Sequence, residues 1–202
     1  KTDSTPGMDV QAALNAKLKA YFLMGVEPGF DFANPYGARQ SMLAAEFVVL
    51  MSAYNHESMH DYADVILPMA PYAETSGTYI NVDNTWQTVK GALAPYGESR
   101  PAWKILRVLG NLLHCDGFEY LSTEDILAEI KNSVAITMEQ EYKPYYPESL
   151  PVMNQSLVRV GEWPLYRSDA IVRNSKELQL CAAAESACIR INPLTADRLN
   201  LE

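Results

Sequence analysis

The sequence is poor in cysteine, with three in 202 residues, at positions 115, 181 and 188. Three cysteines without a close pair exclude a disulfide framework. The last two are seven positions apart, which is not the Cys-x-x-Cys spacing of a zinc ribbon or an iron–sulfur loop. We therefore expect reduced, structural thiols and no metal cluster held by these residues.

Positive charge and long apolar runs are also scarce. The 16 Lys and Arg residues face 25 Asp and Glu residues, which gives a net charge of −9 and a surface that repels nucleic-acid phosphates. The longest apolar runs, such as FVVLM and VILPMAP, are far shorter than the roughly 20 residues of a spanning helix. No Gly-x-Gly-x-x-Gly or phosphate loop is present. The sequence thus predicts a globular protein with neither a nucleic-acid partner nor direct membrane insertion.

Hydrophobic patterns in the first third of the chain alternate between strand and helix. Strands are predicted at 18–25, 47–54 and 65–69, with helices at 38–46 and about 56–63 between them. This β-α-β-α-β order predicts an α/β fold: part of a doubly wound parallel sheet in three αβα layers. The continuous apolar run at 47–54 indicates a strand covered on both faces. Ligands gather at the carboxyl ends of such strands, which here are residues 25–28, 52–55 and 68–71.

The rest of the chain predicts a hairpin, helices and a second domain. Residues 77–91 read as a β-hairpin turning at 82–85. A helix follows with Ser99 as its cap and Pro101 in its first turn, and another begins after Ser122 and Thr123. Domains are predicted at 1–136 (α/β), 137–151 (a linker with three prolines) and 152–202 (a truncated, β-rich C-terminal part with a helix at TADRL). Both ends suggest a piece of a longer polypeptide.

The run HESMH fits the His-Glu-x-x-His pattern of zinc hydrolases. On an α-helix, His56 and His60 would share one face beside Glu57 as a general base. The helix predicted here is short, however, and a third ligand is missing: His114 ends a different helix and Glu74 lies in a loop. We expect two histidines on a connecting helix and no metal, with a zinc hydrolase as a remote alternative.

Residues 63–87 resemble a hallmark of the molybdopterin oxidoreductase superfamily, Ala-Asp-Val-Val-Leu-Pro followed by Gly-Thr-Phe-x-Asn-x-Glu-Gly-Arg-x-Gln. The matching residues are Ala63, Asp64, Leu67, Pro68, Glu74, Gly77, Thr78, Asn81 and Gln87, with Tyr79 for Phe and Asp83 for Glu. GESRPAWKIL and LKAYFLMGVEP resemble two further family segments, the second ending in a Gly-x-Asn-Pro turn. The resemblance implies a pterin pocket around Gly25, Glu27, Asp64, Thr78, Asn81, Asp83 and Gln87.

Two departures from the family pattern concern charge. Glu27 stands where relatives usually have Asn, and Asn84-Thr85 replaces the Gly-Arg pair. An added carboxylate and a lost cation make a poor neighbour for an anionic pterin phosphate. We therefore interpret these positions as a vestigial pocket and expect neither molybdopterin nor a catalytic residue in this chain.

The C-terminal stretch RVGEWPLYRSDAIVRNSKELQ resembles the family of large peripheral-arm subunits of bacterial NADH-quinone oxidoreductase (complex I). The resemblance implies an inactive C-terminal scaffold of an enzyme that passes electrons from NADH to quinone. Its iron–sulfur clusters would lie in a missing N-terminal part. Its partners would be other peripheral-arm subunits, on the cytoplasmic side of the inner membrane. The alternative is part of an active molybdopterin enzyme, such as a formate dehydrogenase.

Overall fold

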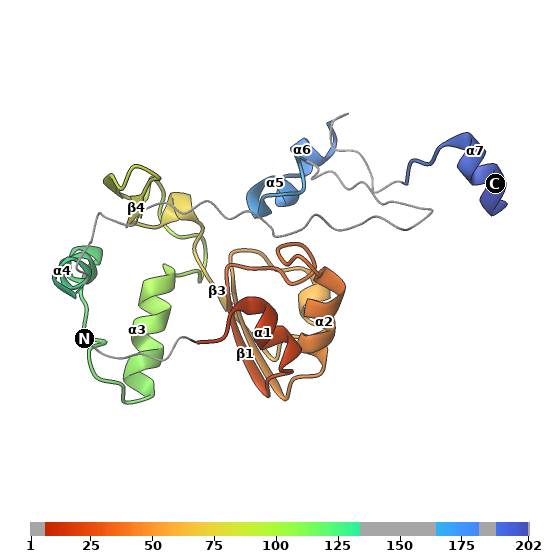
Figure 1. The fold of residues 1–202 in the computed structure, drawn as a ribbon. Helices are drawn as coiled ribbons and strands as arrows, with labels where there is room; N and C mark the ends of the chain where they lie inside the picture. The colour runs from red at the N-terminus through yellow and green to blue at the C-terminus, as the bar shows by residue number, and fades with distance from the viewer. Residues whose placement is uncertain (1–6, 134–164, 182–188, 202) are drawn as a thin grey trace. The chain divides into compact units, whose positions relative to one another are not determined.

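The structure is a computed structural model that describes residues 7–133, 165–181 and 189–201 (Figure 1). The chain divides into two compact units, Lys1–Tyr145 and Tyr146–Glu202. The predicted linker at 137–151 lies outside the described residues, so its boundaries stay a prediction.

A parallel sheet of three strands forms the centre of the first unit. It consists of β1 (Ala20–Met24), β2 (Phe47–Ser52) and β3 (Val65–Pro68) in the order β1-β2-β3, which confirms the predicted α/β class. Gly25 follows the last residue of β1, and its φ of +66° is costly for residues with a Cβ. Compared with the observed strands, the predicted ones are right in kind and one to two residues too long at most ends.

Two helices accompany the sheet, α1 (Val10–Asn15) and α2 (Pro35–Leu43). α2 begins three residues before the predicted 38–46, because the Asn34 side chain accepts a hydrogen bond of 2.9 Å from the Gly37 N–H and Pro35 suits the first turn. α1 is capped in the same way by Asp9, which accepts a hydrogen bond of 2.7 Å from the Ala12 N–H.

The prediction of about two turns of helix at 56–63 is wrong. The HESMH run forms a single 3-10 turn, η1 (Glu57–Met59). The backbone bonds of Met59 to His56 and of His60 to Glu57 are of the 3-10 type, and a separate turn follows, in which the Ala63 N–H donates to the Met59 carbonyl (3.0 Å). Asp64 then joins the chain to the sheet: its backbone N–H donates to the Val48 carbonyl (2.9 Å) and its carboxylate accepts from the Val48 N–H (2.7 Å). These two bonds fix the start of β3 beside β2.

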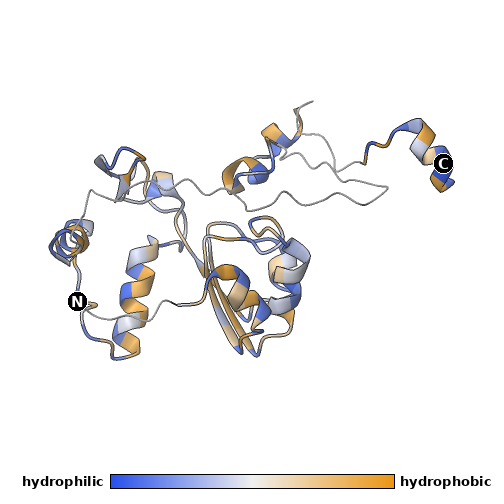
Figure 2. Cartoon of the chain, in the orientation of Figure 1, coloured by the Kyte–Doolittle hydropathy of each residue, from blue (hydrophilic) through white to orange (hydrophobic). Residues whose placement is uncertain are grey.

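The hydrophobic core lies on one face of the sheet. Strand and helix residues form one cluster there: Leu14, Leu23, Ala38, Met42, Val48, Leu50 and Met59. On the other face Phe22, Met24 and Phe47 remain 47%, 50% and 47% exposed. Figure 2 shows hydrophobic residues along these strands. The expectation that residues 47–54 are covered on both faces is therefore wrong at Phe47.

Beyond the sheet, the predicted hairpin is confirmed as β4 (Gly77–Ile80) and β5 (Trp86–Val89), preceded by the 3-10 turn η2 (Tyr72–Glu74). Helix α3 (Ala102–Leu112) is also confirmed, but its capping is not: Pro101 is the N-cap residue, and the Ser99 hydroxyl donates to the Tyr96 carbonyl instead (2.7 Å). In α4 (Thr123–Ser133) the Ser122 hydroxyl accepts from the Asp125 N–H (3.2 Å).

The described part of the second unit is helical. It contains α5 (Ala170–Asn174), α6 (Lys176–Gln179) and α7 (Pro193–Leu199), which includes the predicted TADRL helix. The expected β-rich character does not appear in residues 165–181 and 189–201, and most of LVRVGEWPLY lies outside the described residues. No helix in the described part of the chain is both long and apolar enough to cross a membrane.

Candidate functional site

The carboxyl ends of the three parallel strands meet at one edge of the sheet, as predicted. The Gly25 N–H donates to the Met51 carbonyl (2.9 Å), and the Met69 N–H donates to the Ser52 carbonyl (2.9 Å). Met69 also forms a parallel bridge with Arg100, just before α3. The segments 25–28, 52–55 and 68–71 therefore border this edge, where doubly wound sheets place ligands.

Glu27 is the charged residue enclosed by the turn that follows β1. It is only 7% exposed, and the neighbouring Pro28 is fully buried. The turn closes on itself: the Glu27 carbonyl accepts from the N–H groups of Phe30 and Asp31 (both 2.9 Å), and the Asp31 carboxylate accepts from the Glu27 N–H (2.7 Å). The sequence thus puts a buried carboxylate and its acidic neighbour where the family pattern has an amide.

The pKa of the Tyr62 hydroxyl reflects both its burial and the negative charge of Glu27. Burial, and secondly the negative charge of Glu27, raise the pKa of the Tyr62 hydroxyl to about 12, while Arg39 acts weakly in the opposite direction. Arg39 is itself ion-paired with Asp61. The Tyr62 hydroxyl therefore stays protonated at neutral pH and remains a hydrogen-bond donor.

These residues do not fit an anionic cofactor group at the end of β1. Glu27 and Asp31 bring two carboxylates, and the Arg39 guanidinium, which lies near Tyr62, is ion-paired with Asp61. A pterin phosphate needs cationic or N–H donors instead. We derive no catalytic step through molybdopterin at this edge.

Four further pocket positions of the family pattern lie on the β4–β5 hairpin, and each has a hydrogen bond or a strand pairing within it. The Asn81 side chain accepts from the N–H groups of Asp83 (3.0 Å) and Thr85 (2.8 Å), which closes the turn. The Thr78 and Thr88 hydroxyls bond to each other across the strands (3.1 Å). Gln87 is exposed and pairs with Tyr79 in the ladder.

Asp64 lies at the other end of the sheet from Gly25 and Glu27. It precedes β3 and bonds to Val48 near the amino end of β2, whereas Gly25 bonds to Met51 near the carboxyl end. The structure therefore brings Gly25 and Glu27 together, groups Thr78, Asn81, Asp83 and Gln87 on the hairpin, and leaves Asp64 apart.

The HESMH residues do not share a helix face. The His56 ring stacks on Tyr54, with ring centroids 6.4 Å apart, and a His60 ring nitrogen bonds the Asn55 side-chain oxygen (2.7 Å). Within residues 7–133, 165–181 and 189–201, no group of three His, Cys, Asp or Glu side chains could hold a metal ion. The zinc alternative thus lacks the helix on which it depended.

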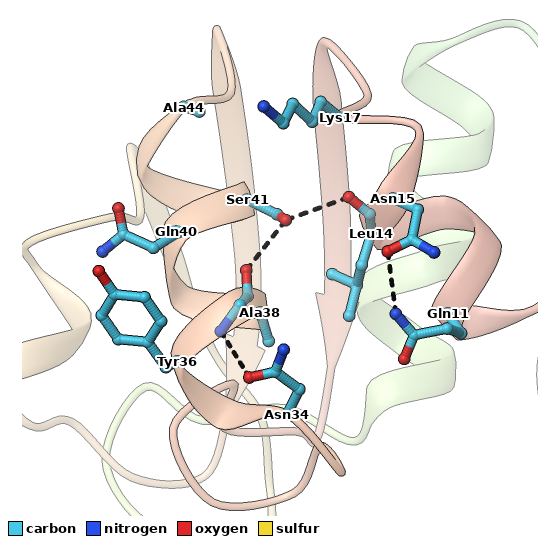
Figure 3. Close-up of a pocket in the computed structure, with 11 residues that line it drawn as sticks. Gln11, Leu14, Asn15, Lys17, Asn34, Tyr36, Ala38, Gln40, Ser41 and Ala44 are labelled. Atoms are coloured by element: carbon cyan, nitrogen blue, oxygen red, sulfur yellow. Dashed lines mark hydrogen bonds between the residues drawn. The ribbon is translucent and has the colours of Figure 1, made fainter.

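A cavity of about 580 Å³ lies between α1 and α2, away from the pterin-like positions (Figure 3). Three of its amide side chains are bonded locally: the Gln11 side chain donates to Asn15 (3.0 Å) and Asn34 caps α2. The Ser41 hydroxyl donates to the carbonyls of Leu14 (3.2 Å) and Gly37 (3.0 Å). The bond between Ser41 and Leu14 joins the two helices.

Sequence reasoning missed the groups that surround Glu27. Arg39 lies on α2 and the adjacent residues Asp61 and Tyr62 follow η1, and only the packing of these two segments beside the sheet brings them together. The pairing of Arg39 with Asp61 spans 22 residues, so no local spacing could have indicated it.

Comparisons with known proteins identify relatives among formate dehydrogenases and nitrate reductases. A profile of the family described as molybdopterin oxidoreductase matches residues 3–112. A nitrate reductase of Symbiobacterium thermophilum is 32% identical over 137 residues, which are 67% of this chain and 18% of that protein. The F420-dependent formate dehydrogenase subunit alpha of Methanocaldococcus jannaschii is 29% identical over 137 residues (65% of this chain, 20% of that protein).

Two more matches are a curated protein and a solved structure. A protein named as a formate dehydrogenase, from Staphylococcus haemolyticus, is 28% identical over 130 residues (62% of this chain, 13% of that protein). Acetylene hydratase from Pelobacter acetylenicus superposes with a TM-score of 0.46 at 18% identity over 54% of this chain and 16% of that chain. The chain thus spans 13% to 20% of the length of the three curated relatives. Because the family profile covers more than half of its residues, the chain belongs to the molybdopterin oxidoreductase family.

Proposed function

We propose that this chain is part of a molybdopterin-dependent oxidoreductase of the kind to which formate dehydrogenases and nitrate reductases belong. The observation that carries the proposal is the family match over residues 3–112, which runs through the sheet, the hairpin and all of α3. The similarity to a nitrate reductase and to formate dehydrogenases supports it. Since the relatives are far longer than this chain, most of their machinery has no counterpart here.

In this proposal the chain supplies a scaffold beside the cofactor. Molybdopterin, when bound, supplies the redox chemistry of the metal it holds. The turn at Gly25 and the buried Glu27 set the shape of the sheet edge. Cationic groups that meet the cofactor phosphate would come from outside the edge formed by Glu27 and Asp31, because those carboxylates repel it.

The test is the cofactor content of the longer polypeptide that contains this chain. We expect molybdenum and pterin near one equivalent, together with formate or nitrate turnover in a dye-linked assay. Glu27→Asn restores the family residue at the turn, and Glu27→Gln is the matched control for loss of charge alone. A purified, folded polypeptide without molybdenum or pterin would contradict the proposal.

A second candidate is a pterin-free scaffold in the large peripheral-arm subunit of an NADH-quinone oxidoreductase. The carboxylate of Glu27 and the absence of Arg at Asn84-Thr85 favour it, because both disfavour a pterin phosphate. In this case the chain contacts other peripheral-arm subunits on the cytoplasmic side of the inner membrane, and iron–sulfur clusters lie elsewhere in the polypeptide.

Cofactor analysis separates the two candidates. Molybdenum and pterin in the long polypeptide favour the first candidate. Iron and acid-labile sulfide without molybdenum, with NADH-quinone activity in the complex that co-purifies, favour the second. Iron alone does not decide between them, so molybdenum, pterin and activity are measured on the same preparation.

A further inference from the structure

A second cavity, of about 380 Å³, lies between β3 and helix α3, and we call it the α3 cavity. Its apolar wall consists of Leu67 of β3 together with Ile105, Val108 and Leu109 of α3. The three helix residues share one face, because positions three and four apart on a helix are neighbours. The volume falls in the range of about 300–1,000 Å³ that small-ligand sites occupy.

Three cationic side chains complete the lining of the α3 cavity: Arg100, Lys104 and Arg107. No carboxylate in the described part of the chain forms an ion pair with any of them. They come together in a chain with a net charge of −9, although like charges placed near one another repel. Cations grouped in this way around an apolar wall create a positive potential that attracts a negatively charged group.

The backbone of Arg100 is fixed to the end of β3. Its N–H donates to the Pro68 carbonyl (3.1 Å), and its carbonyl accepts from the Ala70 N–H (2.8 Å). These bonds lie on either side of Met69, with which Arg100 forms a parallel bridge. A cation whose backbone is held in this way has less freedom to lose when it binds an anion.

Arg107 has a buried donor without an acceptor. Its Nη1 donates to the Tyr120 carbonyl (3.0 Å), which holds the guanidinium against the loop between α3 and α4. The Arg107 Nε is buried, and no group in the described part of the chain accepts a hydrogen bond from it. A buried N–H without an acceptor is destabilising. An anion in the cavity can supply acceptors, because a guanidinium presents its donors in a fixed fork that matches carboxylate and phosphate oxygens.

The start of α3 adds positive potential beside these cations. Pro101 is the N-cap residue and makes no side-chain cap bond. The hydroxyl of Ser99, the residue that the sequence indicated as the cap, donates to the Tyr96 carbonyl instead. The partial positive charge of the helix end therefore meets no capping side chain. Since Arg100 and Lys104 flank this end, it strengthens the attraction for an anion that the two side chains already exert.

We propose that the α3 cavity is a binding site for a small organic anion. A carboxylate or phosphate group of the ligand lies among Arg100, Lys104 and Arg107, and its apolar body contacts Leu67 and the facing turns of α3. An inorganic ion would leave the apolar wall without a contact, and a neutral apolar molecule would leave three cations without a counter-charge. The site needs no molybdopterin, so this inference goes beyond the proposed function and does not rest on it.

Calorimetric titration with phenyl phosphate and with benzoate tests the site. It is performed on the longer polypeptide that contains this chain and, in parallel, on the 202-residue chain. We expect phenyl phosphate to bind at least about ten-fold more tightly than inorganic phosphate, because its ring contacts the apolar wall. Benzyl alcohol, which has the ring without the charge, should not bind, and added salt should weaken the binding of both anions. The tighter of the two anions identifies the head group as phosphate or carboxylate.

Substitutions of the cations locate the bound anion. Lys104→Gln and Arg107→Lys should each weaken the binding of phenyl phosphate about ten-fold, the second because an ammonium lacks the fork of a guanidinium. Lys104 is exposed, so Lys104→Gln still gives a reading if Arg107→Lys does not fold. Lys90→Gln is the matched control: it makes the same change of charge at an exposed residue outside the cavity and should leave the affinity unchanged.

Two spectroscopic signals report from the cavity itself. The Nε–H resonance of Arg107, assigned by its loss in Arg107→Lys, should shift when phenyl phosphate is added and should exchange more slowly with water. The Lys104 Nζ lies 5.4 Å from the centroid of the Trp103 ring. An anion that draws this ammonium toward itself should change the fluorescence of Trp103, and Trp103→Phe should remove the change.

Three outcomes would overturn the inference. Equal affinity for phenyl phosphate and inorganic phosphate would mean that the apolar wall takes no part. Binding that neither Lys104→Gln nor Arg107→Lys weakens would place the anion elsewhere. Binding to the 202-residue chain but not to the longer polypeptide would mean that the rest of the polypeptide fills the cavity. A molybdenum-free polypeptide that binds phenyl phosphate through Lys104 and Arg107 would contradict the proposed function and leave this inference standing.

Discussion

The sheet of the first unit and the helices of the second unit are stabilised in different ways. Leu50 and Met51 of β2 are completely buried, whereas no residue described in 165–181 and 189–201 is buried, and Leu180 is 88% exposed. The short helices α5, α6 and α7 each begin at a side-chain cap, from Asp169, Ser175 and Asn192. Short helices gain little without tertiary packing. The comparison shows that one chain combines a region held by burial with a region held by local hydrogen bonds.

The largest expected effect comes from a cavity in the sheet. Leu50→Ala removes a fully buried side chain from the core cluster and should lower the free energy of unfolding of the first unit by about 2–5 kcal/mol. Leu180→Ala makes the same change at an 88% exposed site and should cost less than about 0.5 kcal/mol. Urea titration followed by tryptophan fluorescence and far-UV circular dichroism measures both. Similar losses of unfolding free energy for the two variants would contradict the proposed difference between the two units.

A smaller effect is expected where α3 meets the following loop. A Cβ at Gly110 would lie 2.2 Å from Phe118 Cγ, so Gly110→Ala forces the Phe118 ring to move. Overpacking of this kind costs about 1–3 kcal/mol. At Gly29 an added Cβ has no atom within 4 Å, so Gly29→Ala is the matched control. Thermal unfolding of the two variants gives the difference; equal melting temperatures would mean that the contact between Gly110 and Phe118 adds nothing to stability.

Loss of a helix cap should increase hydrogen exchange over a wider stretch of the chain in the first unit than in the second. Asp169→Ala removes the acceptor for the Ile171 N–H (2.8 Å), and Asp9→Ala removes the acceptor for the Ala12 N–H (2.7 Å). Each loss should cost about 0.5–2 kcal/mol. Hydrogen exchange should then rise only around α5 for Asp169→Ala. For Asp9→Ala it should rise across α1 and the sheet, because Leu14 of α1 belongs to the core. An Asp169→Ala variant that destabilised the sheet would contradict this division.

The smallest expected effect is a pH dependence at Tyr62. Its pKa is raised to about 12 by burial first and by Glu27 second. A group that holds its proton more tightly in the folded state stabilises the fold below its unfolded pKa near 10, and this contribution is lost as the pH rises toward 12. Tyr62→Phe should therefore remove part of the stability loss between pH 10 and 12.

Tyrosinate absorbance provides the direct measurement. The difference between the titrations of the parent chain and Tyr62→Phe isolates this one hydroxyl among 12 tyrosines. Glu27→Gln should lower the pKa of Tyr62, and Glu27→Asp, which keeps the charge, should lower it less. A titration of Tyr62 near pH 10 in the parent chain would show that neither burial nor Glu27 acts on it.

Local signals in the sequence predicted the order of the sheet well and its connections less well. Short apolar runs located β1, β2 and β3, because strand residues that face the core must be apolar. The two-turn helix at 56–63 failed because the backbone bonds of Met59 to His56 and of His60 to Glu57 are of the 3-10 type, and a separate turn from Met59 to Ala63 follows. Ser99 failed as a cap because its hydroxyl bonds the Tyr96 carbonyl. In both cases residue type favoured an α-helical hydrogen bond, and the backbone formed a different local one.

The candidate site was predictable only in part. The strand order correctly placed Gly25 and Glu27 at the carboxyl edge, since parallel strands must end together. The sequence could not show that Asp64 lies at the opposite edge from Glu27, or that Arg39 is occupied by Asp61. It also pointed first to the histidines of HESMH, whose side chains instead contact their neighbours Tyr54 and Asn55.

By itself the sequence determined the α/β class, the parallel order of strands and the family, because all three follow from the type and spacing of residues along the chain. Only the tertiary structure decided which charges neighbour one another and which apolar surface is left uncovered. Burial, and secondly the charge of Glu27, raise the pKa of Tyr62, and Phe22 stays exposed while Leu23 is buried. These outcomes depend on which segments pack on which face of the sheet, and that is settled by contacts between residues far apart in sequence.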